Sequence, residues 1–552
     1  MANSTITNKE EELEKKLGAI RSHGTEDEYK ALAVKLNIPF SDLASAPIDT
    51  SALSLLSEEV ARQARLAIIL KSGSQLTIAL TNPEDENSKG VIAGLQAKGY
   101  KLSLIMTSPK SLEKILARYA NLKNPETYAI GSLEIQESEI DALQQQIKNV
   151  ADLKSQISAV SVTRLLEILI AGALKIGASD IHFEPETGST RLRYRMDGVL
   201  ESVTAIDEAS YQKVLNRIKV LARLKLNVHG APQDGRFTIR QQDIDIEVRV
   251  SILPSEFGET IVMRLLDPRS IKGSLEDLGM RPDLLTLVKS QLDKPTGAIL
   301  TTGPTGSGKT TTLYAFVNYL NGPGSKIITI EDPIEYHVAG VSQTQVDPQR
   351  GYSFANGLRA IVRQDPDVIL VGEIRDAETA EIALNAALTG HLVLSTIHTN
   401  DAAGTVPRLI DLKVNPQIIA PAIHVAMAQR LVRKLCPTCR KKGVLSAGDL
   451  KTVKEALMPV KDLLGVPDLE TGSIYEPVGC KECNGTGYKG RIGVFEVFVV
   501  TPEVERLILS NPSISAMQEL AIKQGMVTMH QDAYLKLLEG VTSMEEIVRI
   551  LG

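Results

Sequence analysis

One eight-residue segment, GPTGSGKT at residues 303–310, limits what this chain can fold into more than any other. It matches the pattern GxxxxGK[ST], follows an apolar run at 298–302 and precedes the helix-forming run TTLYAFVNYL. Strand, glycine-rich loop and helix, in that order, are the context in which this motif holds phosphate. The glycines let the loop turn its N–H groups inward, and the start of the following helix adds positive potential. The sequence therefore predicts a nucleotide-binding α/β core.

The residues of this loop are the expected ligands of the nucleotide, which we expect to be ATP. Lys309 should reach the β- and γ-phosphates, and the Thr310 hydroxyl should bind Mg²⁺. A chance glycine-rich turn is the alternative, and it is disfavoured because the motif and its context occur together. The predicted nucleotide-binding residues are Gly303, Pro304, Thr305, Gly306, Ser307, Gly308, Lys309, Thr310 and Thr311.

Acidic residues follow two apolar runs that we expect to be strands of the same core. ITIEDPIEY carries Glu331, Asp332 and Glu335, and DVILVGEIRD carries Glu373. Ligands of a parallel α/β sheet bind at the carboxyl ends of its strands, so these acids should face the nucleotide. One carboxylate is needed for the Mg²⁺ shell and another to orient the attacking water. We assign Glu373 to the metal and Glu331 to the water, although the two roles could be exchanged. Asp332 and Glu335 are as readily interpreted as surface capping carboxylates.

A third apolar run, within TGHLVLSTIHTNDA, is flanked by His391 and His398. An imidazole near a γ-phosphate could sense it and report to a neighbouring subunit. A single histidine is more often a structural hydrogen-bonding group, but two around one strand favour a catalytic role. The continuous apolar runs GAILTTG, KIITIED, VILVGE and HLVLSTIH are typical of a parallel sheet that is covered on both faces.

All four cysteines lie in two CxxC pairs, Cys436 with Cys439 and Cys480 with Cys483. Two such pairs supply four thiolates for a tetrahedral Zn²⁺ that is closed to water and therefore structural. A redox dithiol is the alternative, and it is disfavoured because two pairs would make one of them redundant.

Composition and patterning set the class of the protein and its division into domains. A net charge of −6, with 4% aromatic residues and no Trp, disfavours direct binding of nucleic acid. The first residues lack a secretory signal, and no apolar run is long enough to span a bilayer. We therefore expect a cytoplasmic protein that meets a membrane only through partners. The predicted division is an N-terminal α/β docking domain at 1–125, a linker at 126–155, an α+β domain at 156–272, a P-loop core at 273–435, a cysteine module at 436–490 and a helical subdomain at 491–552.

Four segments taken together, GPTGSGKTTTLY, ITIEDPIEY, RQDPDVILVGEIRD and TGHLVLSTIHTNDA, resemble the secretion ATPases of type II secretion and type IV pilus assembly. The resemblance is strong over 160–552 and weak over 30–120. It implies a RecA-like P-loop core behind a PAS-like α+β domain, and a homo-hexamer with ATP at subunit interfaces. It also implies that a platform protein holds the ring peripherally at the inner membrane. The long insert between the cysteine pairs fits the tetracysteine zinc domain of assembly-type members.

In this family the α+β domain supplies arginines to the phosphates. The matching stretch, RVSILPSEFGETIVMRLLD, offers Arg249 and Arg264. A guanidinium can neutralise the charge that spreads over the γ-phosphoryl oxygens, whereas a surface salt bridge is the plainer interpretation of each. Arg236 is a weaker candidate, because VHGA departs from the charged residues usual before PQDGR. KLGAI at 16–20 is a poor match to the paired motifs that bind cyclic di-GMP in some members, so docking is the better prediction for the N-terminal domain.

Two other classes of function stay open from the sequence alone. A nucleic-acid motor with the same core would bind DNA with a steep salt dependence. An inactive nucleotide switch would release no phosphate.

Overall fold

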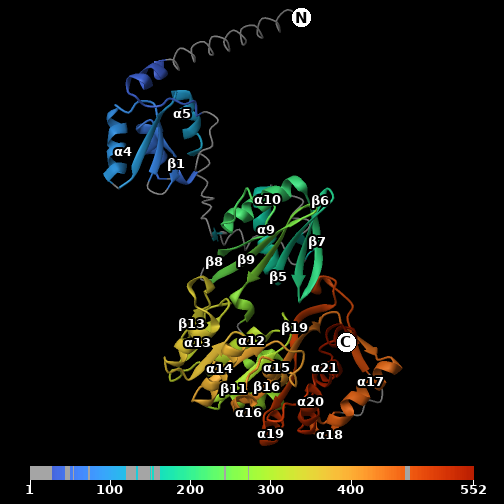
Figure 1. The fold of residues 1–552 in the computed structure, drawn as a ribbon. Coiled ribbons are helices and arrows are strands. Elements are labelled where there is room, and N and C mark those ends of the chain that lie inside the picture. Colours follow the sequence, from blue (N-terminus) through green and yellow to red (C-terminus); the bar gives the residue numbers. More distant parts are fainter. Residues whose placement is uncertain are drawn as a thin grey trace, which may run out of the picture. The chain divides into compact units, whose positions relative to one another are not determined.

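The computed structural model describes residues 28–43, 50–53, 55–72, 75–97, 99–119, 132–134, 150, 152–153, 162–241, 244–271, 273–466 and 473–552. The chain divides into two compact units, Met1–Tyr128 and Ala129–Gly552 (Figure 1). Most of the predicted linker and the KLGAI segment lie outside the described residues. Among the described residues, no helix combines the length and the apolar character that crossing a bilayer requires.

The first unit contains the predicted α/β domain. Its three-stranded sheet has the order β1-β2-β3, with β1 antiparallel to β2 and β2 parallel to β3. The alternating apolar side chains of these strands supply two buried clusters, one on either side of the sheet. The elements are α2 (Thr50–Leu53), α3 (Glu58–Gln63), β1 (Leu66–Ser72), β2 (Gln75–Leu80), α4 (Glu86–Ala97), β3 (Lys101–Met106) and α5 (Pro109–Leu116).

The α+β domain opens the second unit and is a seven-stranded sheet of order β4-β8-β9-β10-β5-β6-β7. Helices α9 and α10 pack against one face of it, over a core that includes Ile181, Phe183, Tyr194 and Val248. The elements are β4 (Ser132–Glu134), α9 (Val162–Ile176), β5 (Ala178–Glu186), β6 (Ser189–Met196), β7 (Val199–Asp207), α10 (Glu208–Leu221), β8 (Gln233–Gln241), β9 (Ile244–Ser255) and β10 (Gly258–Leu266).

The opposite face of this sheet carries a row of arginines. Arg249 on β9 lies directly opposite Arg264 on β10 and Arg236 on β8. Directly opposed residues of neighbouring strands point to the same face, and like charges so placed repel. The row therefore concentrates positive charge on the face of the sheet that α9 and α10 do not cover.

The P-loop core is a second seven-stranded sheet, of order β13-β12-β14-β15-β11-β16-β19, parallel except for β19. Alternate residues of its strands face opposite helical layers. In β14, Ile369 and Val371 join a cluster with α13 to α16, and Val368 and Leu370 join one with α11 and α12. The predicted parallel sheet, covered on both faces, is confirmed. The elements are η1 (Pro268–Ile271), η2 (Leu275–Leu278), α11 (Pro282–Leu292), β11 (Gly297–Thr302), α12 (Lys309–Leu320), β12 (Ile327–Glu331), β13 (Ser342–Gln345), η3 (Pro348–Arg350), α13 (Phe354–Val362), β14 (Val368–Val371), α14 (Ala377–Leu388), β15 (Leu392–Ile397), α15 (Thr405–Asp411), α16 (Pro416–Ala422) and β16 (Ile423–Leu435).

The C-terminal segment differs from the prediction of helices throughout 491–552. It begins with the strand β19 (Tyr488–Val499), which pairs antiparallel with β16 and completes the core sheet. The run RIGVFEVFVV is rich in β-branched and aromatic residues, which favour a pleated, half-buried surface. The helices α19 (Pro502–Ile508), α20 (Ile514–Lys523), α21 (Met529–Leu538) and α22 (Met544–Leu551) follow.

Between β16 and β19 lies the cysteine module, which has a small two-stranded sheet of its own. Its core, with Val453, Leu457 and Ile474, is shared with Tyr534 and Leu537 of α21. The elements are β17 (Lys441–Val444), α17 (Ala447–Leu457), η4 (Met458–Val460), α18 (Lys461–Leu464), β18 (Ser473–Glu476) and η5 (Lys481–Cys483).

Candidate nucleotide site and cysteine cluster

The loop between β11 and α12 has a backbone that requires its glycines. Gly303, Gly306 and Gly308 have φ values of 144°, 81° and 90°, a region that side chains disfavour. A β-carbon at position 303 would lie 2.5 Å from the backbone carbonyl oxygen of Gln429. One at position 308 would lie 2.8 Å from the side-chain Nε2 of Gln429. The Ser307 hydroxyl is buried with no hydrogen-bond partner among the described residues. A tight glycine cradle with an unsatisfied hydroxyl fits a phosphate group.

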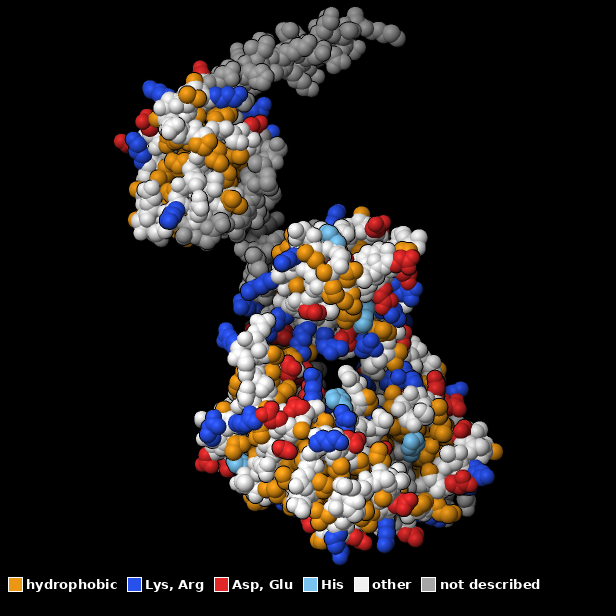
Figure 2. Space-filling model, viewed as in Figure 1, with side chains coloured by type: hydrophobic (Ala, Val, Ile, Leu, Met, Phe, Trp, Pro, Cys, Tyr) orange, Lys and Arg blue, Asp and Glu red, His pale blue; other side chains and the backbone are white. Residues whose placement is uncertain are grey.

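A cavity of about 470 Å³ opens above this loop at the carboxyl ends of the strands. The structure brings most of the predicted site residues together around it, from the loop and from β12, β14 and β15. The polar and charged lining residues include Thr305, Lys309, Thr310, Thr311, Tyr314, Glu331, Asp332, Glu335, Glu373, Arg375, Thr396, His398 and Arg491. Where the α+β domain meets the core, Figure 2 shows basic and acidic side chains gathered around a hollow.

Lys309 supplies the positive charge of the loop. Its ammonium group donates hydrogen bonds to the carbonyl oxygens of Gly303 at 2.7 Å and Pro304 at 3.0 Å. Burial lowers the pKa of Lys309, although the Glu373 carboxylate acts in the opposite direction. A partly desolvated ammonium held by neutral carbonyls gains most from an anionic ligand.

Glu373 follows β14 and contacts two other side chains at this edge of the sheet, Arg375 and His398. It forms an ion pair with Arg375, and its Oε2 lies 3.3 Å from His398 Nε2. Because β14 and β15 are parallel neighbours, Glu373 and His398 leave the sheet at the same edge. The sequence did not single out Arg375, although its place two residues after Glu373 puts it at the same strand end.

Glu331 and Glu335 differ in how much of each carboxylate is left for a ligand. Glu331 is buried, with 4% of the residue exposed. It accepts hydrogen bonds from the Tyr314 hydroxyl, from Thr329 Oγ1 at 2.6 Å and from Gln343 Nε2 at 3.3 Å. Burial and the Glu331 charge raise the pKa of Tyr314, so its hydroxyl stays protonated. Glu331 is thus already satisfied by the protein, whereas Glu335, with a side chain 29% exposed, faces the cavity.

Arg249 reaches the edge of the cavity from the α+β domain. Its Nη2 lies 3.1 Å from Glu335 Oε2 and donates to the Ile334 carbonyl oxygen at 3.3 Å. Arg264, by contrast, is 57% exposed and donates to Asp180 at 2.9 Å, and it is not among the lining residues. Arg236 is 67% exposed and lies near Glu247. In this arrangement one of the two predicted arginines contacts the site.

His391 is not brought to the cavity. It precedes β15 and is buried, and its Nδ1 lies 2.9 Å from the Ala386 carbonyl oxygen. His398 follows the same strand, whose six residues separate the two rings by roughly 20 Å at about 3.3 Å per residue. The sequence places one histidine at each end of this strand, but it does not show which end lies at the cavity.

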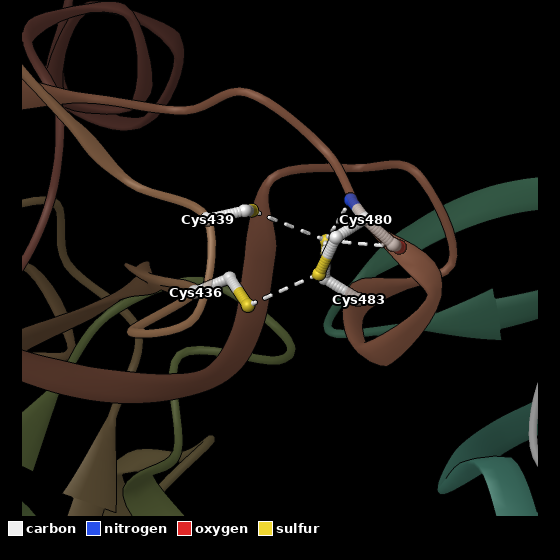
Figure 3. A group of neighbouring side chains, drawn as sticks. All are labelled: Cys436, Cys439, Cys480 and Cys483. Atoms are coloured by element: carbon white, nitrogen blue, oxygen red, sulfur yellow. Dashed lines mark hydrogen bonds between the residues drawn. The ribbon is translucent and has the colours of Figure 1, made fainter.

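The four cysteines converge, as Figure 3 shows, with all four Sγ atoms within 4.8 Å of one another. Cys436 lies 3.9 Å from Cys480, Cys439 lies 3.8 Å from Cys483, and Cys480 lies 3.7 Å from Cys483. Four ligands about 2.3 Å from a tetrahedral zinc lie about 3.8 Å apart, so this set fits that ion.

Backbone amides of the second CxxC pair favour the thiolate form that binds metals. Cys483 Sγ accepts from the N–H groups of Cys480 at 3.1 Å and Gly487 at 3.2 Å. Burial alone would raise the pKa of Cys483, but these donors and the neighbouring thiols outweigh it and lower the pKa to about 7. A thiol near neutrality loses its proton to a metal readily.

Comparison with known proteins places these features in a family. Residues 155–549 match the model of the type II/IV secretion system proteins, and residues 36–124 match the MshEN domain. The type IV pilus assembly ATPase PilB of Myxococcus xanthus is 35% identical over 537 residues, covering 97% of this chain and 92% of that protein. The type II secretion system protein E of Dickeya dadantii is 37% identical, covering 92% of this chain and 99% of that protein.

Among solved structures, the ATPase DotB of Legionella pneumophila matches with a TM-score of 0.52 at 21% identity. The match covers 70% of this chain and 94% of that structure, which supports the fold. The family model, the relatives of similar length and the P-loop geometry agree. The chain therefore belongs to the family of type II/IV secretion system proteins, and it is a P-loop ATPase of that family.

Proposed function

We propose that this chain hydrolyses ATP as a homo-hexameric motor, which powers type IV pilus assembly or type II secretion. The ring would work at the cytoplasmic face of the inner membrane, bound to a platform protein. Relatives that match nearly the whole chain are named for pilus assembly and for type II secretion, so both machines are retained.

The observation that carries this proposal is the shared cavity at one sheet edge. It brings a basic phosphate loop, two strand-end carboxylates and an arginine-bearing domain together within one chain. Phosphoryl transfer needs little covalent chemistry from a protein. It needs a positioned phosphate, a metal shell, an oriented water and cations for the developing charge.

The residues divide among these tasks as follows. The loop N–H groups and Lys309 would bind the phosphates, and Thr310 and Glu373 would hold Mg²⁺, whose charge stabilises the transferring group. We move the water-orienting role from Glu331 to Glu335, since the carboxylate of Glu331 is taken up by three protein donors. Arg249 would stabilise the γ-phosphoryl charge, and His398 would sense it through Glu373.

The cysteine cluster would hold a structural zinc ion. All four ligand positions are taken by protein thiolates, which leaves no position for water or substrate. We therefore assign the metal to folding of the module rather than to hydrolysis.

Lys309→Ala tests the proposal most directly. Removing the ammonium should lower steady phosphate release from ATP by at least about 100-fold, because the β- and γ-phosphates lose their main side-chain cation. Lys451→Ala removes an exposed lysine of α17 and is the matched control. Turnover that survives in Lys309→Ala would overturn the assignment of the loop.

A further inference from the structure

The cysteine module and the α+β domain touch at two points that are far apart in the sequence. The Gly490 N–H donates to Asp197 Oδ2 at 2.8 Å, and Arg491 Nε lies 3.9 Å from Asp197 Oδ1. The Val150 N–H donates to Asn484 Oδ1 at 2.9 Å. Gly490 and Arg491 open β19, directly after the segment that carries Cys480 and Cys483, and Val150 packs against the core of the domain that carries Arg249. Both contacts therefore join that segment to the α+β domain.

Each contact is made by a side chain whose backbone is set by a tight turn. Asp197 and Gly198 have φ values of 48° and 85°, the pattern of a two-residue hairpin turn between β6 and β7. Asn484 has a φ of 53° and ends the short helix η5 of the second CxxC pair. In Figure 3 a strand of the α+β domain lies beside this loop. Turns of this kind fix the backbone from which each side chain projects.

The same segment also reaches the nucleotide cavity. Arg491 lines the cavity and follows Gly490 directly on β19. The module is thereby joined on one side to the cavity and on the other to the domain whose arginine meets Glu335.

We propose that the cysteine module fixes the α+β domain in the position over the nucleotide cavity that ATP hydrolysis requires. Asp197 and Asn484 act as positioning residues. This inference rests on the proposed role of the α+β domain in hydrolysis. It gives the module a task during the reaction: a metal-stiffened loop sets where Arg249 lies, although it touches no phosphate itself.

The test removes both side-chain contacts without disturbing either turn. Asp197→Gly combined with Asn484→Gly suits the positive φ of both positions, because glycine adopts that region without strain. Asn511→Gly is the matched control, since Asn511 is an exposed turn residue with a φ of 55°. Asp197→Asn is the conservative variant, which keeps the turn and one acceptor oxygen for the Gly490 N–H.

Three measurements on the full-length protein are made with each variant. Amide exchange at Val150 and Gly490 should quicken about tenfold in the double variant, because each N–H loses its acceptor. The kcat for ATP should fall about five- to tenfold with KM changed less than about twofold, because the arginine is misplaced while the phosphate loop is intact. Zinc content should equal that of the wild type. Asp197→Asn should restore most of the exchange protection at Gly490, and Asn511→Gly should match the wild type throughout.

Metal removal gives a second arm. Chelating zinc from the wild type should produce the same exchange change at Val150 and Gly490, and chelation should add little to it in the double variant. Unchanged exchange in the double variant, or faster exchange with unchanged kcat, would overturn the proposal. Arg249→Ala separates this failure from failure of the proposed function: full turnover in Arg249→Ala refutes the arginine role itself, and loss of turnover there leaves that role standing.

Discussion

Two glutamates four residues apart, Glu331 and Glu335, show what decides the role of an acid at a strand end. Glu331 is the last residue of β12, where Tyr314 of α12 and Gln343 of β13 reach it from neighbouring elements. Glu335 lies beyond the strand and meets solvent, the cavity and Arg249. The number of protein hydrogen bonds that each carboxylate accepts, more than its distance from the phosphate loop, decides whether it is structural or free to act on a ligand.

Exchanging each carboxylate for its amide tests this difference. Glu335→Gln should keep ATP binding and lose turnover by about 100-fold, the usual contribution of a positioned proton acceptor. Glu331→Gln should retain turnover within about tenfold, because an amide oxygen still accepts from the Tyr314 hydroxyl. Phosphate release and binding of a fluorescent ATP analogue are measured on both. The reverse order of activities would return the water-orienting role to Glu331.

At the residue scale the sequence predicts the loop and the cysteine ligands well and the acids less well. The phosphate loop is a continuous motif whose chemistry is local, so Lys309 and Thr310 could be placed from spacing alone. The contacts of the two acids with Tyr314 and His398, by contrast, join different elements. Glu331 meets Tyr314 of α12, and Glu373 meets His398 only because the parallel strands β14 and β15 end at the same edge of the sheet.

The strand β19 and the helix α22 show how the C-terminal segment is fastened at the element scale. Glu546 near the start of α22 is fully buried and accepts three hydrogen bonds from Arg433 on β16, with N···O distances of 2.8–2.9 Å. Arg549 donates to it at 2.6 and 2.7 Å. One carboxylate thus joins the last helix to the core sheet.

The protonation of Glu546 should govern acid stability of this junction. Burial acts to raise the pKa of Glu546, but hydrogen bonds from Arg549 and Arg433 outweigh it and lower the pKa. A lowered pKa in the folded state stabilises the fold above the unfolded pKa of about 4.3, and this stability is lost as pH falls through the folded value. Glu546→Gln should cost about 3 kcal/mol at pH 7, the usual cost of breaking a buried ion pair.

Urea unfolding of both proteins between pH 7 and pH 3 measures the effect. The difference in the free energy of unfolding between wild type and Glu546→Gln should become smaller as pH falls below about 4.3. Glu545→Gln changes the exposed neighbour and is the control. A gap that stays constant with pH would show that the ionised carboxylate does not stabilise the junction.

Elements of the core were predicted more securely than those at its edge. Four continuous apolar runs suit strands buried on both faces, and all four are strands. For most of the edge strand β19, within 491–552, the sequence predicts helix instead. Its β-branched and aromatic run favours a strand, but its antiparallel partner β16 lies on the far side of the cysteine module, so the sequence does not show what the strand pairs with.

At the scale of the whole molecule, the chain has two units with separate cores. The first unit contains the residues that match the MshEN domain, and the second unit contains the cavity and the cysteine cluster. Within the part of the chain that the structure describes, the residues that line the cavity all belong to the second unit. Hydrolysis and docking should therefore be separable.

Removal of residues 1–128 tests that separation. The shortened protein should hydrolyse ATP within about twofold of the full chain, because its core and site are complete. It should no longer bind the platform protein. Phosphate release and co-sedimentation with membranes that contain the platform protein measure the two properties. Loss of hydrolysis on deletion would show that the first unit takes part in the reaction, and retained membrane binding would place the docking surface elsewhere.

The long strand β16 has a mechanical consequence. It begins beside β11, the strand that leads into the phosphate loop, and it ends one residue before Cys436. From Val425 to Leu435 it pairs with β19 through backbone hydrogen bonds. The strand beside the phosphate loop and the cysteine cluster thus lie at opposite ends of one continuous strand, so a displacement at either end has a direct covalent route to the other.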